Sequence, residues 1–207
     1  NEMNQALRIS AQVISWGLHP LLVPSIVSYL LADRHANLMG TVLPASWLFV
    51  LMFLLTGVMP AMSLALLRVL GAIRSLELPD RQERLMPAIL ITLLYFSVTV
   101  MFEVRYPSPA LVSLMIILTA VAATGTLLTR WWKVSLHAMC ASAATAVLTA
   151  AALMDPVGDN VTPAIAILAT GLIMSARLVL DAHTMKEVWT GAIAGALIAG
   201  PAMFFLF

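Results

Sequence analysis

The chain is poor in charge. Of its 207 residues only 10% are charged, whereas 61% are hydrophobic. Soluble domains carry about 25% charged residues, so this composition excludes a water-soluble domain. The 11 Lys and Arg nearly balance the 10 Asp and Glu, which leaves no basic surplus to bind nucleic acid regardless of its sequence. We therefore expect no nucleic-acid partner.

The chain is also poor in cysteine, with Cys140 alone. One thiol excludes a disulfide within the chain and a zinc site built from cysteines. Eleven of the 13 Met residues lie inside apolar runs, where packing explains them better than metal binding does. No metal and no other cofactor is expected. Because no polar tail or internal repeat interrupts the chain, residues 1–207 are expected to form a single integral-membrane domain.

Long apolar runs are what the sequence has in abundance. Seven uncharged runs cover residues 9–32, 38–67, 85–102, 109–129, 136–154, 161–175 (continuing past Arg177 to 180) and 188–207. A helix needs roughly 17–25 residues to cross a bilayer, and none of the runs shows the alternation of a membrane barrel strand. The sequence predicts an all-α, polytopic transmembrane bundle of six to seven crossing helices.

Two of the runs differ from a simple span. Run 38–67 is long and has a proline near each end, which favours one crossing followed by an interfacial helix. Run 9–32 has two prolines after His19, and proline breaks helical hydrogen bonding, so this run is either a kinked span or a re-entrant hairpin. A cleavable signal peptide fits poorly, because the run is too long, has Arg8 as its only basic flank and lacks a small-residue cleavage site.

The remaining charges gather in three segments, at residues 68–84, 130–137 and 175–195. Ionisable groups at membrane depth are costly and tend to be paired or functional. Two predicted crossings separate the first segment from the second, and two more separate the second from the third. All three segments should therefore lie on one membrane face, whereas residues 33–35, 103–105 and 155–159 should lie on the other.

The third segment holds the most specific pattern. His183 and Glu187 are four residues apart, which would place them on one helix face. A carboxylate that binds one ring nitrogen leaves the other more nucleophilic. Arg177 precedes them, and a guanidinium is well shaped to grip two phosphate oxygens. The alternative is that Arg177, Asp181, Lys186 and Glu187 simply form a solvated cap between two spans.

This spacing resembles the third signature of the type 2 phosphatidic acid phosphatase superfamily, in which Ser-Arg, five residues, His, three residues and Asp follow one another. Arg177, His183 and Glu187 stand at these intervals, and Gly191 and Gly195 follow at steps of four. The two glycines also form a small-residue face suited to close helix packing.

Two further segments resemble the other signatures of that superfamily. Ser135-Leu136-His137 is similar to Pro-Ser-Gly-His. Arg74, followed after six intervening residues by Arg81-Gln82, is similar to Lys, six residues, Arg-Pro. Several positions depart from the family pattern, among them Leu136 where the family has Gly. The resemblance covers residues 68–195, which would form a phosphatase-like core.

The resemblance implies an integral-membrane, metal-independent phosphatase that hydrolyses a lipid phosphate or a polyprenyl diphosphate through a phosphohistidine. His183 would be the nucleophile, Glu187 its orienting acid and His137 the general acid. The residues that would bind substrate are Arg74, Arg81, Arg177 and Ser135. For Arg84 we favour an interfacial anchor over a part in the phosphate clamp.

Other interpretations stay open at this point. A relative that has lost activity could serve as a structural or lipid-binding subunit of a membrane complex, and a homo-oligomer is compatible with either function. The expected location is a bacterial inner membrane. Most Lys and Arg lie on the face of the three segments, so the positive-inside rule places that face in the cytoplasm, whereas the resemblance implies the periplasmic side.

Overall fold

The computed structural model describes residues 2–41, 43–75, 81–105, 108–156 and 158–207. Within these ranges the chain forms helices and no strand. Six helices are long and apolar enough to cross a membrane, and they carry many exposed large apolar side chains, including Leu168, Leu197 and Phe205. Such surfaces suit contact with lipid. The predicted all-α transmembrane bundle is confirmed, with six candidate crossings.

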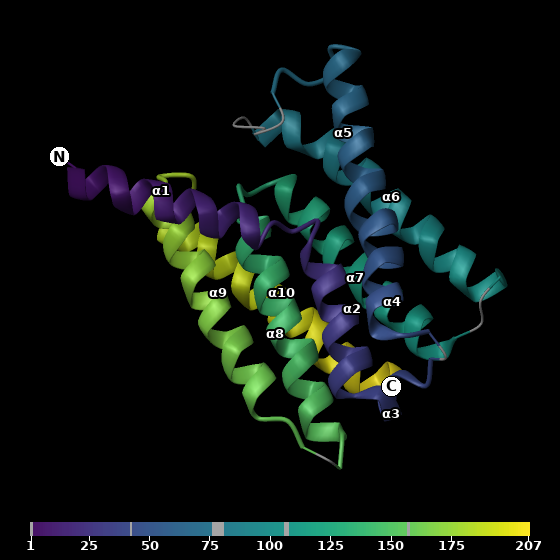
Figure 1. Ribbon diagram of the computed structural model, residues 1–207. Helices are drawn as coiled ribbons and strands as arrows, with labels where there is room; N and C mark the ends of the chain where they lie inside the picture. The colour runs from purple at the N-terminus through teal and green to yellow at the C-terminus, as the bar shows by residue number, and fades with distance from the viewer. Residues whose placement is uncertain (1, 42, 76–80, 106–107, 157) are drawn as a thin grey trace.

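Most of the predicted runs coincide with helices. The five later spans are α6 (Arg81–Arg105), α7 (Pro109–Thr129), α8 (Leu136–Met154), α9 (Val161–Val179) and α10 (Met185–Leu206). Charged or turn-forming residues bound these runs in the sequence, so the helix ends fall within a few residues of the predicted ones. Figure 1 shows the helices gathered into one bundle, with α8, α9 and α10 side by side.

The first span keeps one direction to its end. It runs without a break over Ala45–Val69 as α4 (Ala45–Met52), a π-helical segment (Phe53–Val58) and α5 (Met59–Val69). The separate interfacial helix expected after the crossing is therefore wrong. Pro60 has no N–H and crowds the carbonyl four residues earlier, and the wider π turn accommodates this. That carbonyl, on Thr56, accepts a hydrogen bond from the Tyr95 hydroxyl of α6 at 3.0 Å.

Run 9–32 is divided into two helices by a turn. It forms α1 (Glu2–Gly17) and α2 (Val23–Arg34), and α3 (Ala36–Met39) follows. The chain turns at His19 and Pro20, as the prolines indicate. In Figure 1, α1 lies across the end of the bundle where α9 stops and α10 starts, and α2 descends beside α8.

A glycine seam joins α8 to α10. A Cβ on Gly191 would lie 2.5 Å from the Ser135 carbonyl oxygen, and a Cβ on Gly195 would collide with the Met139 carbonyl. Close backbone approach also lets the Ser142 hydroxyl donate to the Ala192 carbonyl at 2.6 Å. The predicted small-residue packing is confirmed. Because the seam begins within the first two turns of α10 and at the N-cap of α8, it places His137 and His183 at the same end of the bundle.

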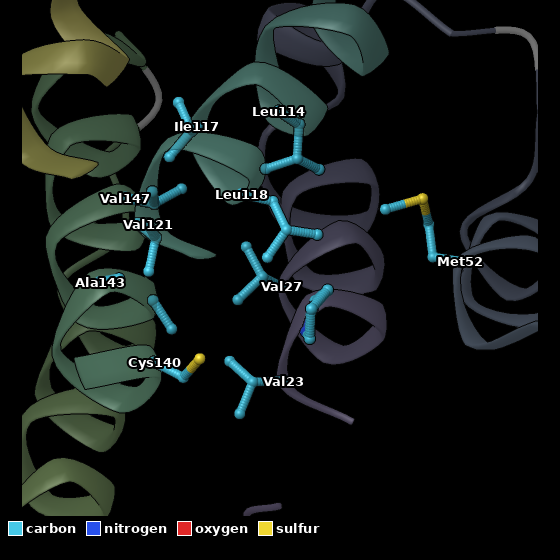
Figure 2. Close-up of a pocket in the computed structure, with 12 residues that line it drawn as sticks. Val23, Val27, Met52, Leu114, Ile117, Leu118, Val121, Cys140, Ala143 and Val147 are labelled. Atoms are coloured by element: carbon cyan, nitrogen blue, oxygen red, sulfur yellow. The ribbon is translucent and has the colours of Figure 1, made fainter. Parts of the chain in front are cut away.

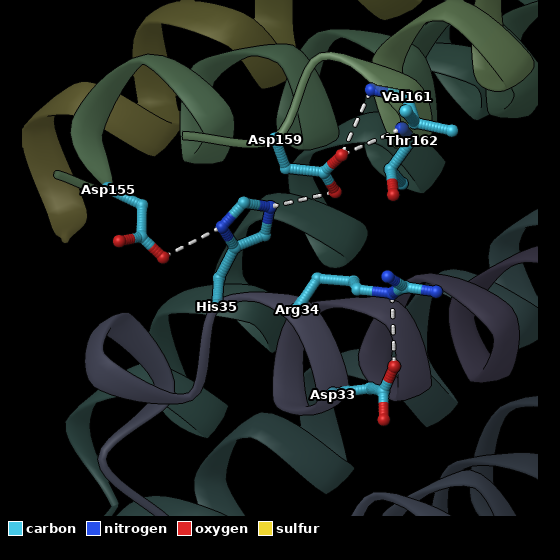
Figure 3. Close-up of polar contacts among 7 residues, drawn as sticks. All are labelled: Asp33, Arg34, His35, Asp155, Asp159, Val161 and Thr162. Atoms are coloured by element: carbon cyan, nitrogen blue, oxygen red, sulfur yellow. Dashed lines mark hydrogen bonds and ion pairs between the residues drawn. The ribbon is translucent and has the colours of Figure 1, made fainter. Parts of the chain in front are cut away.

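The two ends of the bundle separate the charged segments as predicted. His137, Arg177 and His183 lie at the start of α8, the end of α9 and the start of α10, respectively. At the opposite end, the ring of His35 lies between Asp155 and Asp159 (Figure 3). The even number of crossings between the three segments is sufficient to explain this separation.

Candidate functional site

His183 and Glu187 form the hydrogen bond that their spacing predicts. The His183 Nδ1 and Glu187 Oε2 atoms are 3.1 Å apart, and the side chain of His183 is only 3% exposed. The predicted shared helix face is wrong, however. Thr184 is the N-cap and α10 begins at Met185, so His183 precedes the helix and its contact with Glu187 reaches across the cap.

The Glu187 carboxylate has two tasks. It accepts a hydrogen bond from the Thr184 backbone N–H at 3.0 Å, while the Thr184 hydroxyl accepts one from the Glu187 N–H at 3.4 Å. This reciprocal capping box starts α10. Thr-x-x-Glu is the sequence signature of a capping box, so the amino-acid sequence alone could have predicted this role of Glu187. The Glu187 side chain therefore caps α10 and orients His183 at the same time.

The environment of His183 keeps its ring neutral. Because a carboxylate only accepts hydrogen bonds, Nδ1 carries the proton and Nε2 keeps its lone pair. Burial lowers the pKa of His183, and the nearby Arg84 and Arg177 lower it further, although the hydrogen bond that His183 donates to Glu187 opposes them. A neutral imidazole with an available Nε2 lone pair is the form that a nucleophile needs.

Arg177 stands at the centre of the site. It lies within electrostatic range of His19, His137 and His183. Its Nη1 donates to the Ser15 hydroxyl at 3.0 Å. Its Nε is buried and has no hydrogen-bond partner in the part of the chain that the structure describes. A buried N–H donor without an acceptor is unusual, and it suits an anion that would bind there.

Arg84 belongs to the same group of charges. It is half-buried near the start of α6, and it lies within electrostatic range of Glu187, Arg177 and His183. This position does not fit the interfacial anchor that the sequence favours for Arg84. Two guanidinium groups therefore lie within electrostatic range of His183, an arrangement that would suit a doubly charged anion.

His137 faces this group from the second residue of α8. It lies within electrostatic range of Arg177 and His183, and it forms a hydrogen bond with the backbone of Ser15. The ring of His19 meets it edge to face, with 5.3 Å between the ring centroids. The two histidines of the predicted catalytic pair therefore lie at one end of the bundle, as a shared site requires.

Two predicted substrate-binding residues have other partners for their side chains. Ser135 is fully buried, its hydroxyl caps α8 by accepting from the Ala138 N–H at 3.4 Å, and its backbone N–H donates to the Glu187 carbonyl at 3.2 Å. The side chain of Arg74 is 87% exposed and pairs with Glu83 at 3.2 Å, away from the buried histidines. Arg81 begins α6, but its side chain lies outside the described residues.

Leu136 stands at the position where the resembled signature has glycine, and its side chain packs against α7 beside Gly125. Its Cδ2 atom lies 2.9 Å from the position that a Cβ on Gly125 of α7 would take. The side chain is thus accommodated against α7 because Gly125 has none. The bulk of Leu136 is directed at a neighbouring helix.

Two residues of the site come from the first 20 residues, which the signatures do not cover. They are Ser15, on α1, and His19, in the turn after it. In the sequence His19 stands beside a helix-breaking proline, and its approach to His137 is a tertiary contact that no local spacing predicts. In the described part of the chain, no group of three or more His, Cys, Asp or Glu is arranged to hold a metal ion.

An apolar pocket begins one helical turn along the chain from His19 and His137. It lies between α2, α7 and α8, with Met52 of α4 at its edge, and every lining side chain is apolar or a thiol (Figure 2). Val23 follows His19 by four residues and Cys140 follows His137 by three, so the end of the pocket that these two residues line adjoins the site. The pocket thus extends from the charged end of the bundle into its apolar interior.

Comparison with protein-family models, curated proteins and solved structures gave no match. What the chain does must therefore be inferred from its own residues.

Proposed function

We propose that the chain is an integral-membrane phosphatase that removes phosphate from a lipid phosphate or a polyprenyl diphosphate. The observation that carries this proposal is the convergence of the His183–Glu187 pair with His137, Arg177 and Arg84 at one end of a transmembrane bundle. A nucleophile, its orienting acid, a second histidine and two cations are the parts that phosphoryl transfer without a metal requires.

The proposed reaction has two steps. First, the Nε2 lone pair of His183 bonds to phosphorus while the bond from phosphorus to the lipid oxygen breaks, and His137 gives that oxygen a proton. A phosphohistidine remains. Second, His137 takes a proton from water, the water oxygen bonds to phosphorus, and the electron pair of the N–P bond returns to His183 as phosphate leaves.

Charge complementarity supports this sequence of events. Arg177 and Arg84 would bind the phosphoryl oxygens and stabilise the charge that they carry in the transition state. The bound dianion would also favour the protonated ring of His137, which the first step needs. Glu187 would keep the Nδ1 proton of His183 in place and stabilise the charge that the ring gains when it is phosphorylated.

The surroundings of the site favour an amphiphilic substrate. The end of the apolar pocket that Val23 and Cys140 line (Figure 2) follows His19 and His137 along the chain, and we take this pocket of about 50 Å³ to receive the first carbon atoms of the substrate's hydrocarbon tail. A tail bound there would hold the phosphate beside His183. A water-soluble phosphate ester would gain nothing from that pocket.

The deciding experiment measures phosphate release by the full chain in lipid nanodiscs, with a panel of lipid phosphates and polyprenyl diphosphates. We expect turnover of at least one substrate and no loss on addition of a chelator. His183→Ala should reduce the rate at least about a thousandfold, because a covalent catalyst is lost. Lys186→Ala, an exposed neighbour in the same turn, is the matched control and should behave as wild type.

Two outcomes would overturn the proposal. One is a wild-type protein that releases phosphate from no member of the panel. The other is a His183→Ala variant that keeps more than about a tenth of the wild-type rate, since that is too much activity for an enzyme without its nucleophile.

A further inference from the structure

His19 is held against the site by rings on two sides. Its ring meets His137 edge to face at 5.3 Å, with an interplanar angle of 84°. Trp16 stacks on it at 6.3 Å with an angle of 27°. Because His19 lies in the turn between α1 and α2, where Pro20 prevents a continuous helix, its ring reaches the site from a corner of the backbone.

The hydrogen bonding of His19 identifies which nitrogen carries its proton. The backbone N–H of Leu21 donates to Nδ1 at 3.3 Å. Nδ1 must therefore present a lone pair, and the proton of the neutral ring lies on Nε2. Burial lowers the pKa of His19, and the charge of Arg177 lowers it further. His19 is thus a neutral donor that offers a single N–H group.

The helix before His19 is fastened to the same arginine. The Ser15 hydroxyl accepts from Arg177 Nη1 at 3.0 Å, and Ser15 is only 6% exposed. At the other end of α1, Arg8 pairs with Asp181 at 3.0 Å, but both of these side chains are exposed and such pairs contribute little. The buried contact with Arg177, together with the hydrogen bond between His137 and the Ser15 backbone, therefore holds the end of α1 that leads to His19 against the site.

We propose that His19 is a third histidine of the site, whose Nε2–H donates a hydrogen bond to an oxygen of the phosphoryl group bound by Arg177. The buried, unpartnered Nε of Arg177 points to an anion at this place independently of His19. The inference rests on the proposed function and extends its substrate-binding group to a residue outside all three signatures.

The test compares two variants of the full chain in nanodiscs. His19→Phe keeps a ring against His137 but has no N–H, whereas His19→Gln keeps an N–H donor and loses the ring. We measure the dissociation constant of orthovanadate, and the KM and kcat for a lipid phosphate. A hydrogen bond from a neutral donor to an anion predicts that His19→Phe weakens vanadate binding about tenfold.

The expected pattern is specific to a hydrogen-bonding role. His19→Gln should bind vanadate within about threefold of wild type, and Gln12→Ala, an exposed position on α1, should match wild type. The loss in His19→Phe should appear mainly in KM. If His19→Phe is not monodisperse, His19→Leu takes its place, because it also lacks a donor.

The outcomes separate the two proposals. If His19→Phe binds vanadate as wild type does, or if His19→Gln binds as weakly as His19→Phe, the role of His19 is overturned while lipid phosphatase activity stands. If the wild type hydrolyses no lipid phosphate but binds vanadate with the expected pattern, His19 is a ligand of the anion and the phosphatase proposal fails. A wild type that binds no vanadate overturns both.

Discussion

The two ends of the bundle use buried histidine in opposite ways. At one end, His183 and His137 lie among arginines, and a carboxylate holds only one ring nitrogen of His183. At the other end, the ring of His35 is 1% exposed and lies between two carboxylates, with Nδ1 at 3.0 Å from Asp155 Oδ2 and Nε2 at 3.9 Å from Asp159 Oδ2 (Figure 3). Surrounding charge decides what each ring can do.

The acidic end is a joint between helices. Asp155 is the C-cap of α8, and Asp159 accepts hydrogen bonds from the backbone N–H groups of Val161 and Thr162, both at 3.0 Å. Hydrogen bonds from Thr162, and then from Val161, hold the pKa of Asp159 below its usual range. His35 joins these two carboxylates to the end of α2. The His35 ring, with a carboxylate at each nitrogen, stabilises the contact between α2 and the α8–α9 connection. The His183 ring lies near arginines, where an anion could bind beside it.

The largest expected effect breaks the acidic joint. His35→Ala should lower the free energy of unfolding by about 3 kcal/mol, because it removes the ring between two carboxylates, one of them fully buried. Urea or thermal unfolding in detergent measures this. Asp33→Ala breaks only the exposed pair with Arg34 and should cost less than about 1 kcal/mol.

The same variant also tests the division of labour between the ends. The folded fraction of His35→Ala should keep the wild-type KM for a lipid phosphate, because His35 lies a full span away from His183. A change in KM without loss of stability would show that the two ends are not independent.

A smaller effect concerns the cations of the active end. Arg177→Lys should weaken inhibition by orthovanadate about tenfold, because one ammonium cannot reproduce the two parallel hydrogen bonds of a guanidinium. The inhibition constant is compared with that of Arg68→Lys, at the end of α5, which should leave inhibition unchanged. Equal inhibition of Arg177→Lys and wild type would remove Arg177 from the anion site.

The smallest effect is a shift along the pH axis. The pKa of His183 lies below the ordinary value of 6.5, so its neutral form persists as the pH falls. The acid limb of the kcat/KM profile, which reports groups of the free enzyme, should therefore have its midpoint below pH 6.5. Arg84→Gln removes one of the charges that lower this pKa and should move the midpoint upward. A downward shift would contradict the assignment.

Much of the fold was predictable because a membrane-spanning helix is recognised from the length and hydrophobicity of one continuous run of residues. Runs 109–129 and 136–154 match α7 and α8 at both ends, since charge and turn residues bound them. Counting crossings was sufficient to bring His137 and His183 to one face. The prolines of run 9–32 also indicated its turn. The position of α1 across the end of the bundle could not be predicted, because it depends on contacts with α9.

The site was predictable only in part, for a related reason. The His183–Glu187 bond is local, so its spacing revealed it. Arg84, Ser15 and His19 reach the site through helix packing, which single-residue spacing does not encode. Ser135 carries a second signal that the resemblance did not use: a serine directly before an apolar run is also an N-cap signal, and its hydroxyl caps α8.

The glycine seam between α8 and α10 has a consequence for genetics. Gly191 and Gly195 do not touch the proposed substrate, yet they determine how closely the helices bearing His137 and His183 approach each other. In a screen of all single substitutions for lost activity, these two glycines should rank beside the histidines. When these hits are marked on the structure, they would extend from the site along the contact between α8 and α10. The glycine positions would then resemble a catalytic surface, although they act only by setting the distance between the two helices.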